Sequence, residues 1–288
     1  MKVSILFNCQ HRMLADVLRL VRPDIEVVDT LINGLWNDGQ RDAVADALAD
    51  CDLVLSLPLG PDWGRLASAA LRDEGRRVIM LPAFSFAGFH PDTIYVQGEA
   101  AAIKGFTDDY HSRIAVAGFL EGYSVARTAG LYNALVMGRA GYFSSFAEER
   151  LLLCQSFAAY GIHIEPLLDA WATRGCFMHS VNHPKHWCYA DVALALCQHA
   201  GLAGDGVAVD AALVNDDLSL GPTHPVLSPL ARRLGVAAET HFKPVASVPY
   251  PAVPLERFIE LEVECFAAVP VVQLEAASGV ATLRGAIR

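Results

Sequence analysis

Short apolar runs alternate with helical patterns through the first third of the chain, and this alternation restricts the fold more than any other feature. Apolar runs typical of buried strands occupy residues 3–7, 25–31, 53–57 and 78–81. Patterns with helical spacing separate them at residues 13–21, 42–49 and 63–72. Strands buried on both faces lack polar alternation, and repeated strand–helix units favour parallel pairing. The sequence therefore predicts an α/β protein with a doubly wound, mostly parallel sheet.

The later parts of the chain have a different pattern. Between residues 106 and 202 the spacing is helical, and beyond it the chain is rich in glycine and proline, with one helical pattern at residues 255–266. We expect an α/β catalytic domain over residues 1–202, with a βαβ core at 1–105 and a helical cover at 106–202. Residues 203–288 are expected to form an irregular C-terminal extension packed on the core.

Composition excludes several classes of protein. The net charge is −10 and no more than two basic residues are consecutive, so the chain lacks the basic footprint of a nucleic-acid-binding protein. Hydrophobic residues make up 53%, but no apolar run reaches the length of a membrane span, which indicates a rich core instead. The seven cysteines show no paired spacing and lie mostly in apolar segments, so we expect reduced thiols and a cytoplasmic location.

The first candidate for chemistry is Cys9, in the segment Asn8-Cys9-Gln10-His11 where the first strand gives way to a helix. Ligands of doubly wound sheets bind at the carboxyl ends of the strands. Free N–H groups at a helix start lower a thiol pKa and stabilise an oxyanion, so this position suits a nucleophile. The alternative is a small residue that packs beneath the turn, as free cysteines commonly do.

The second candidate is His183, in a histidine-rich segment at residues 179–186 that precedes a helical pattern. Pro184 is well placed for the first turn of that helix, which puts His183 in a loop. A histidine there can act as a general base toward a thiol or a hydroxyl. Capping or packing of the helix start is the alternative.

The third candidate is the turn at residues 86–92, which follows the fourth strand at the same edge of the sheet as Cys9. His90 and Asp92 could line a substrate pocket there. An Asx turn formed by Asp92 is the simpler interpretation.

Other site classes are disfavoured. The close spacing of His183, His186 and Cys188 could suggest a metal, but no CxxC or HExxH pattern supports one, so we expect no metal site. The first strand is followed by neither GxGxxG nor a Walker motif, and the chain has no GxSxG elbow.

Four short motifs in a fixed order carry a family resemblance. They are Asn8-Cys9-Gln10, Gly88-Phe89-His90-Pro91-Asp92, Tyr110-His111-Ser112 and Asn182-His183-Pro184. Over residues 1–202 the chain resembles the WcbI-type polysaccharide-biosynthesis enzymes. The resemblance implies coenzyme A binding and transfer of an acetyl group from acetyl-CoA to a sugar hydroxyl in capsule or surface-polysaccharide assembly. It implies that Cys9 is the nucleophile, His183 the base and Gln10, with backbone N–H groups, the oxyanion site. Phe7 stands where relatives often have glycine.

The arrangement is also similar to SGNH-type esterases, with cysteine in place of serine. Two alternatives to acyl transfer therefore stay open: an esterase or deacetylase using the same pair of residues, and a non-catalytic protein that binds coenzyme A or a sugar. His183 could also act directly on a sugar hydroxyl while Cys9 is structural. The candidates for cofactor binding are Asn8, Arg12, Arg65, His90, His111, Arg113, Asn182 and Lys185, with Lys104 as a further basic residue near the candidate loops. Each basic residue could equally be a solvated surface charge.

Overall fold

A parallel sheet forms the centre of the first part of the protein. The computed structural model describes all residues from 1 to 288. The sheet has four strands in the order β2-β1-β3-β4, and every neighbouring pair is parallel. The strands are β1 (Lys2–Phe7), β2 (Glu26–Leu31), β3 (Leu53–Ser56) and β4 (Val78–Met80). The α/β fold with a doubly wound parallel sheet is confirmed.

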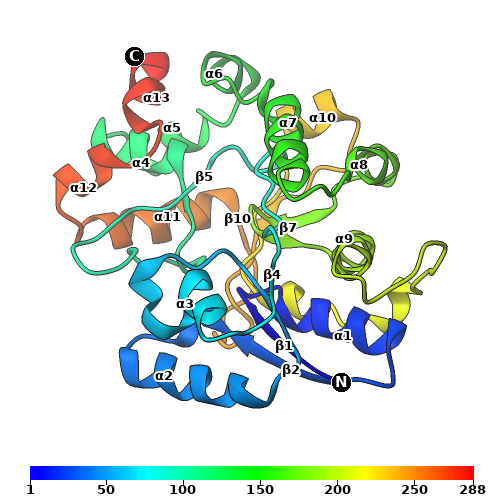
Figure 1. Cartoon of the computed structure of the whole chain (residues 1–288). Helices are drawn as coiled ribbons and strands as arrows, with labels where there is room; N and C mark the ends of the chain where they lie inside the picture. Colours follow the sequence, from blue (N-terminus) through cyan, green and yellow to red (C-terminus); the bar gives the residue numbers. More distant parts are fainter. The chain divides into compact units, whose positions relative to one another are not determined.

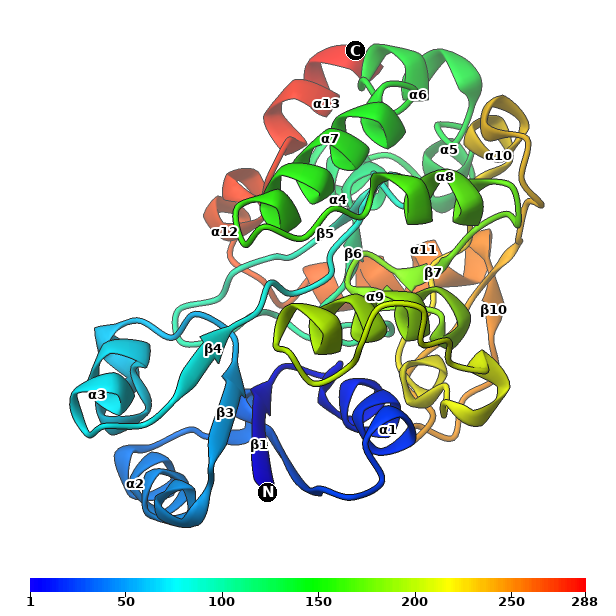
Figure 2. The same ribbon diagram turned by 45° about the vertical axis from the view of Figure 1, so that its right-hand side comes forward.

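The position of β1 inside the sheet follows from its composition. Val3, Ile5, Leu6 and Phe7 are fully buried, as expected for a strand with a neighbour on each side. β2 lies at the sheet edge and is only partly buried. Because β2 and β3 lie on opposite sides of β1, the strand order reverses at β1, and Figure 2 shows β1 and β3 side by side. Ligands of such sheets bind at this reversal, beyond the carboxyl ends of the strands.

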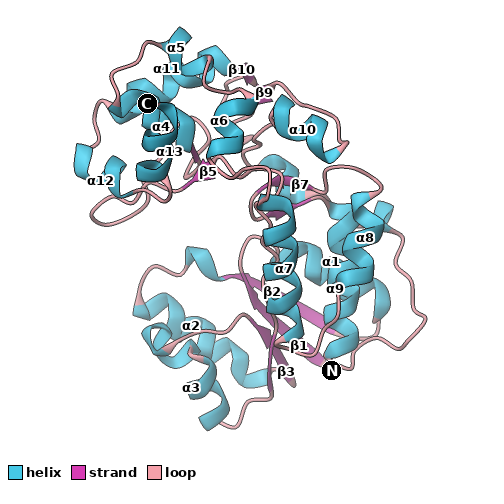
Figure 3. Ribbon diagram, turned by 90° about the horizontal axis from the view of Figure 1, so that it is seen from above, coloured by secondary structure: helices cyan, strands magenta, loops and turns pink.

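Helices cover both faces of the sheet. Figure 3 shows α2 and α3 on one face and α1 and α9 on the other. Helix α1 places Met13, Leu14, Val17 and Leu18 on its buried side, which is the spacing of an amphipathic helix. The helices of this part are α1 (His11–Val21), α2 (Asp38–Ala47), α3 (Ser68–Asp73), α8 (Glu165–Ala172) and α9 (His186–His199).

Two predicted helices of this part have different bounds. Helix α2 begins earlier than expected because Asn37 and Gln40 form a reciprocal capping box at its start. The single helix expected over residues 63–72 is divided into a 3-10 helix (Pro61–Leu66), which Gly64 interrupts with φ +56°, and α3, which begins after the non-helical Ala67. A left-handed backbone of this kind ends a helix and favours glycine.

The chain folds as two compact units, each built from separate stretches of sequence. The first unit holds residues 1–84, 152–170 and 183–218, and the second holds 85–151, 171–182 and 219–288. This division differs from the expected boundary at residue 202. Helix α7 (Ser145–Ala158) contributes to both units, and short 3-10 turns lie at Ile32–Gly34, Leu48–Asp50, Ala211–Leu213 and Asp217–Leu220.

The second unit is mainly helical, and Figure 1 shows α11, α12 and α13 gathered with α4. Its core includes Ile94, Val116, Phe266, Leu274 and Val280, so the C-terminal residues complete the core around α4. Its helices are α4 (Arg113–Leu120), α5 (Val125–Ala129), α6 (Ala134–Arg139), α10 (Ser228–Leu234), α11 (Leu255–Phe266), α12 (Val271–Ala276) and α13 (Val280–Ile287). Its short strands are β5 (Thr93–Ile94), β6 (His111–Ser112), β7 (Met178–Ser180), β9 (His241–Phe242) and β10 (Val253–Pro254).

Helix α11 has the predicted bounds, whereas α10, α12 and α13 were not expected in the C-terminal region. Within the helical region, residues 125–139 form two separate helices, because Ser124 and Asn133 each cap a separate start. None of the helices combines the length and the apolar composition that a membrane span requires.

Candidate functional site

Cys9 lies directly beyond the carboxyl end of β1, in the tight turn that leads into α1. The Asn8 side chain accepts a hydrogen bond from the Gln10 N–H at 3.0 Å, and the Asn8 carbonyl accepts one from the His11 N–H at 2.9 Å. These two bonds fold the backbone sharply around Cys9, in the manner of an Asx turn. The thiol is half-buried and makes no hydrogen bond to another side chain. Cys9 therefore occupies the strand reversal where this fold binds ligands.

Gln10 is fully buried, and its side chain binds the backbone of Phe84, in the segment that follows β4. Its Nε2 donates to the Phe84 carbonyl at 2.6 Å, and its Oε1 accepts from the Phe84 N–H at 3.1 Å. Both ends of the side-chain amide are thus engaged by backbone groups. The expected role of the Gln10 side chain as an oxyanion donor does not agree with this arrangement, and we assign it a positioning role.

The thiol of Cys9 is not activated in the isolated protein. Burial raises its pKa to about 11, and a hydrogen bond from its own backbone N–H lowers the pKa only in part. The expected lowering of this pKa by the helix start was wrong, because loss of solvent outweighs the favourable backbone groups. A nucleophilic Cys9 needs a base that accepts its proton.

Tyr189, on α9, is a residue near Cys9 that the sequence did not single out. Its side chain is fully buried and its hydroxyl has no hydrogen-bond partner. Burial raises the pKa of Tyr189 strongly, and the nearby Cys9 contributes to the rise. Its ring packs edge-on against Phe84, the residue that Gln10 holds. Because Tyr189 stands among apolar residues of α9, the sequence gives no indication that its hydroxyl lies near Cys9.

His183 belongs to the same compact unit as Cys9, in the short strand β8 (His183–Pro184) and not in the expected loop. It is half-buried. The neighbouring His186 begins α9 and its Nδ1 contacts Asp216 Oδ2 at 3.1 Å. His11, next to the Cys9 turn, contacts Asp29 at 2.7 Å. These two histidines thus already have carboxylate partners.

The basic candidates of the first unit separate into two kinds. Arg65 pairs with Asp46 at 2.7 Å and with Glu74 at 3.4 Å, so its charge is already compensated. Arg12, in the first turn of α1, and Lys185, at the N-cap of α9, make no ion pair. Because α1 and α9 pack against each other, these two uncompensated cations lie on neighbouring helices. They fit an anionic ligand better than Arg65 does.

His90, His111, Arg113 and Asn182 belong to the second unit, unlike Cys9. His90 is 3% exposed and His111 is fully buried, so neither side chain is accessible to a cofactor in this structure. The Asn182 amide accepts from the Tyr110 hydroxyl and donates to that of Tyr95 at 3.4 Å. The expected cofactor roles of His90 and His111 therefore do not agree with their burial.

His111 instead forms a buried ion pair with Glu262 of α11. The Nδ1 atom of His111 lies 3.1 and 3.2 Å from the two carboxylate oxygens, and its Nε2 donates to the Ile103 carbonyl at 3.0 Å. Burial opposes protonation of His111, but the hydrogen bond and charge of Glu262 prevail and raise its pKa. Glu262 also accepts from the Ser112 N–H, so this carboxylate fixes the start of α4.

Asp92 is the centre of a second buried polar cluster. Its Oδ1 accepts from the Tyr142 hydroxyl at 2.8 Å and from the Ile114 N–H at 3.0 Å, and its Oδ2 accepts from the Ser112 hydroxyl. Burial raises the pKa of Asp92 despite these donors. The cluster joins the turn after β4 to the start of α4. Asp92 therefore binds residues distant in the sequence, and not only its own turn as an Asx turn would.

His224 has a packing role inside the second unit. Its Nδ1 and Nε2 contact the hydroxyls of Thr93 and Thr107 at 3.0 and 3.1 Å. Burial lowers its pKa to about 3, so it is neutral.

Comparison with known proteins decides the family. The family model described as polysaccharide biosynthesis enzyme WcbI matches residues 2–205. The chain belongs to this family. The resemblance inferred from the four motifs is thus confirmed, and the match covers nearly the same residues. No curated protein matches the chain.

A solved WcbI structure supports the fold. It is described as native WcbI, a novel polysaccharide biosynthesis enzyme, without a disulfide bond between coenzyme A and one of its cysteines. It superposes with a TM-score of 0.73 and 15% identity, over 100% of this chain and 98% of that chain. The family fold therefore extends through residue 288, beyond the part that the family model matches.

Proposed function

We propose that this WcbI-family protein is an acyltransferase that moves an acetyl group from acetyl-CoA to a sugar hydroxyl. The observation that carries the proposal is the place of Cys9, a half-buried thiol at the strand reversal and next to the start of α1. The solved WcbI structure is described with reference to a disulfide between coenzyme A and a cysteine, which supports a thiol near the coenzyme thiol. We also propose that the protein is cytoplasmic and acts in the biosynthesis of a capsule or another surface polysaccharide.

The residues around Cys9 are compatible with coenzyme A. Its phosphates require cations or helix N–H groups. Arg12 and Lys185 carry uncompensated charges, and the first turn of α1 has no side-chain cap. These groups are our candidates for the phosphate contacts, with Asn8 shaping the turn.

The proposed chemistry needs two steps. Cys9 Sγ attacks the acetyl carbonyl after its proton passes to His183, and the proton then leaves with the coenzyme thiol as the thioester bond breaks. In the second step His183 takes the proton of a sugar hydroxyl, the sugar oxygen attacks the acetylated Cys9, and the Cys9 thiol is restored. The first step exchanges one thioester for another, so its free-energy change is close to zero. A cysteine nucleophile therefore suits acetyl transfer from coenzyme A better than it suits hydrolysis of an ester.

The test does not require the acceptor to be known. The protein is mixed with acetyl-CoA and isotopically labelled coenzyme A, and label in acetyl-CoA is measured over time, while calorimetry measures coenzyme A binding. The wild type is expected to exchange, and Cys9→Ala and His183→Ala to bind but exchange at least about a hundredfold more slowly. Cys51→Ala, another half-buried cysteine in the same unit, serves as the control.

Each alternative has its own result. Full exchange by Cys9→Ala would overturn covalent transfer. Release of acetate to water without an acceptor, at a rate above the exchange, would indicate a hydrolase. Binding of coenzyme A without exchange or hydrolysis in the wild type would exclude the covalent mechanism and leave either direct transfer, with His183 acting on the sugar hydroxyl, or a non-catalytic protein. Absence of coenzyme A binding would remove the proposed donor.

A further inference from the structure

Two neighbouring cavities of the second unit share one cationic residue, Arg113. The larger, of about 590 Å³, lies between the segment at residues 93–97 and helix α12, and the smaller, of about 280 Å³, lies at the start of α13. Arg113 and Ser278 line both cavities. Their combined size is in the range of pockets that hold small molecules.

The Arg113 side chain is held in place but is not neutralised. Its guanidinium lies over the Tyr142 ring, 5.5 Å from the centroid, and a Cβ on Gly279 would approach its Cζ to 2.9 Å. It makes no hydrogen bond and no ion pair, and its Nε is buried. The guanidinium is therefore fixed by its neighbours, and the part of it that lines the two cavities has no protein acceptor that an anionic ligand would have to displace.

Carboxylates neutralise several other arginines of this acidic chain, but not Arg113. Acidic residues outnumber basic ones by 32 to 22, and Arg65, Arg257 and Arg284 all bind carboxylates. Neither cavity has an aspartate or glutamate in its lining. Arg113 thus provides a local positive charge where an anion meets no repulsion from the walls.

Asp92 is the acidic group that acts on Arg113 from the protein interior. Its backbone carbonyl accepts from the Arg113 N–H at 2.8 Å, but its carboxylate binds Ser112, Tyr142 and Ile114 instead of the guanidinium. Burial raises the pKa of Asp92, while its hydrogen bonds and the nearby charge of Arg113 lower the pKa in part, but Asp92 and Arg113 form no ion pair. The positive charge of Arg113 therefore stays available on the cavity side.

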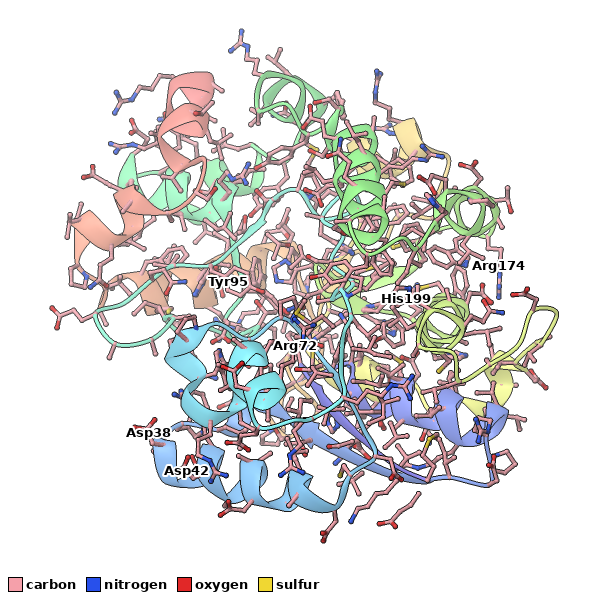
Figure 4. All side chains as sticks on the ribbon, viewed as in Figure 1. Asp38, Asp42, Arg72, Tyr95, Arg174 and His199 are labelled. Atoms are coloured by element: carbon pink, nitrogen blue, oxygen red, sulfur yellow. The ribbon has the colours of Figure 1, made fainter.

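The other lining groups define the kind of molecule. The lining of the larger cavity combines the hydroxyls and amides of Thr93, Gln97, Gln273 and Ser278 with apolar side chains and with the half-exposed Tyr95 that Figure 4 labels. The apolar residues are Ile94, Val272, Ala276 and Ala277. Such neutral donors and acceptors match the hydroxyls of a sugar, with an aromatic ring at one side. One guanidinium matches one carboxylate or phosphate group. A coenzyme A molecule, with a diphosphate and a further 3′-phosphate, would require more cations than this site has.

We propose that these cavities bind an acidic sugar, with its carboxylate or phosphate on Arg113. The proposal deepens the proposed function and rests on it, since it takes the bound sugar to be the acetyl acceptor. The sequence led us to expect that Arg113 binds the cofactor. The proposal instead assigns Arg113 to the binding of the acceptor sugar.

The test measures binding of three sugars to the full chain by saturation-transfer NMR and calorimetry: glucuronate, glucose 1-phosphate and glucose. At least one anionic sugar is expected to bind about tenfold more tightly than glucose, since a charge-assisted pair is worth at least that factor. Arg113→Gln should abolish this preference and Arg113→Lys should retain part of it. Ser278→Ala, at an exposed position, should weaken binding without affecting the fold.

Arg127→Gln is the matched control, because Arg127 also lies over a tyrosine ring, that of Tyr123, but lines neither cavity. Equal affinity for glucose and both anions, or an unchanged preference in Arg113→Gln, would overturn the proposal. Loss of coenzyme A binding in Arg113→Gln would assign Arg113 to the donor and also overturn it. If the anionic sugar binds but the acetyl exchange fails, the sugar site stands and transfer through an acetylated Cys9 falls.

Discussion

The side-chain amide of Gln10 binds both backbone groups of Phe84, at 2.6 Å to the carbonyl and 3.1 Å to the N–H. The two residues are separated by 74 positions in the sequence. Gln10 thus imitates a strand partner and fixes the chain just after β4 against the turn that carries Cys9. The turn that carries Cys9 is therefore held by two uncharged hydrogen bonds from a fully buried side chain.

Replacement of Gln10 by alanine is expected to destabilise the protein by about 2–4 kcal/mol, because it leaves two buried backbone groups without partners. Urea unfolding followed by circular dichroism gives the free energy of unfolding. Gln155→Ala, at an exposed position on α7, should change it by less than about 0.5 kcal/mol. A loss for Gln10→Ala no greater than that of the control would contradict the role assigned to this pair.

Cys9 is expected to react slowly with iodoacetamide at neutral pH. Because its pKa is raised to about 11, the thiolate fraction and the rate should rise about tenfold per pH unit from pH 7 to 9, without a plateau. Mass spectrometry of the peptide that contains Cys9 measures the rate, with Cys9→Ser to confirm the assignment. A plateau near pH 7 would mean that the thiol is already activated in the free protein.

The His111–Glu262 pair should give the protein a stability that depends on pH. The pKa of His111 is raised in the folded state, so its contribution is complete below the unfolded value near 6.5 and is lost as the pH rises through the folded value. The loss amounts to about 1.4 kcal/mol for each unit by which the pKa is raised. Unfolding curves between pH 5 and 9 measure it.

The variant His111→Gln should remove this pH dependence, while His241→Gln, at an exposed position, should retain it. The same slope in His111→Gln and wild type would show that another group is responsible.

The variant Tyr142→Phe is expected to lower the free energy of unfolding by about 1–3 kcal/mol, because it removes a hydrogen bond to the buried Asp92. Thermal and urea unfolding at pH 7 measure the change, with Tyr160→Phe, which is only half-buried, as the control. Since phenylalanine keeps the ring on which Arg113 lies, the variant should retain binding of an anionic sugar. If the free energy of unfolding of Tyr142→Phe equals that of the wild type, the hydrogen bond from Tyr142 to Asp92 does not stabilise the fold.

The parallel sheet was predictable because its signal is local. The apolar run Val3–Phe7 reads as a strand buried on both faces, and the segment after it leads into an amphipathic helix. The place of Cys9 at the sheet edge follows from that order alone. Its pKa was not predictable, because the burial that raises it involves residues such as Tyr189, far along the chain.

The role of His111 was missed for a similar reason, since Glu262 lies 151 positions away. A signal existed, however. Glu262 stands four positions from both Phe258 and Phe266, on the apolar face of α11. A carboxylate on a buried helix face requires a buried partner, and His111 is one of the few groups that can supply it. The short helices α12 and α13 had no comparable signal.

The interleaving of the two units has a consequence for the order in which the protein can be made. The second unit takes in residues 85–151, then 171–182 and finally 219–288, so α4 emerges from the ribosome long before α11 and α13 that cover it. Until those helices arrive, the nascent chain exposes the apolar side of α4 and the uncompensated His111. The fold has a high proportion of distant contacts, which slows folding and increases exposure to aggregation. A gene truncated near residue 205, where the family match ends, would produce a chain with this surface permanently uncovered.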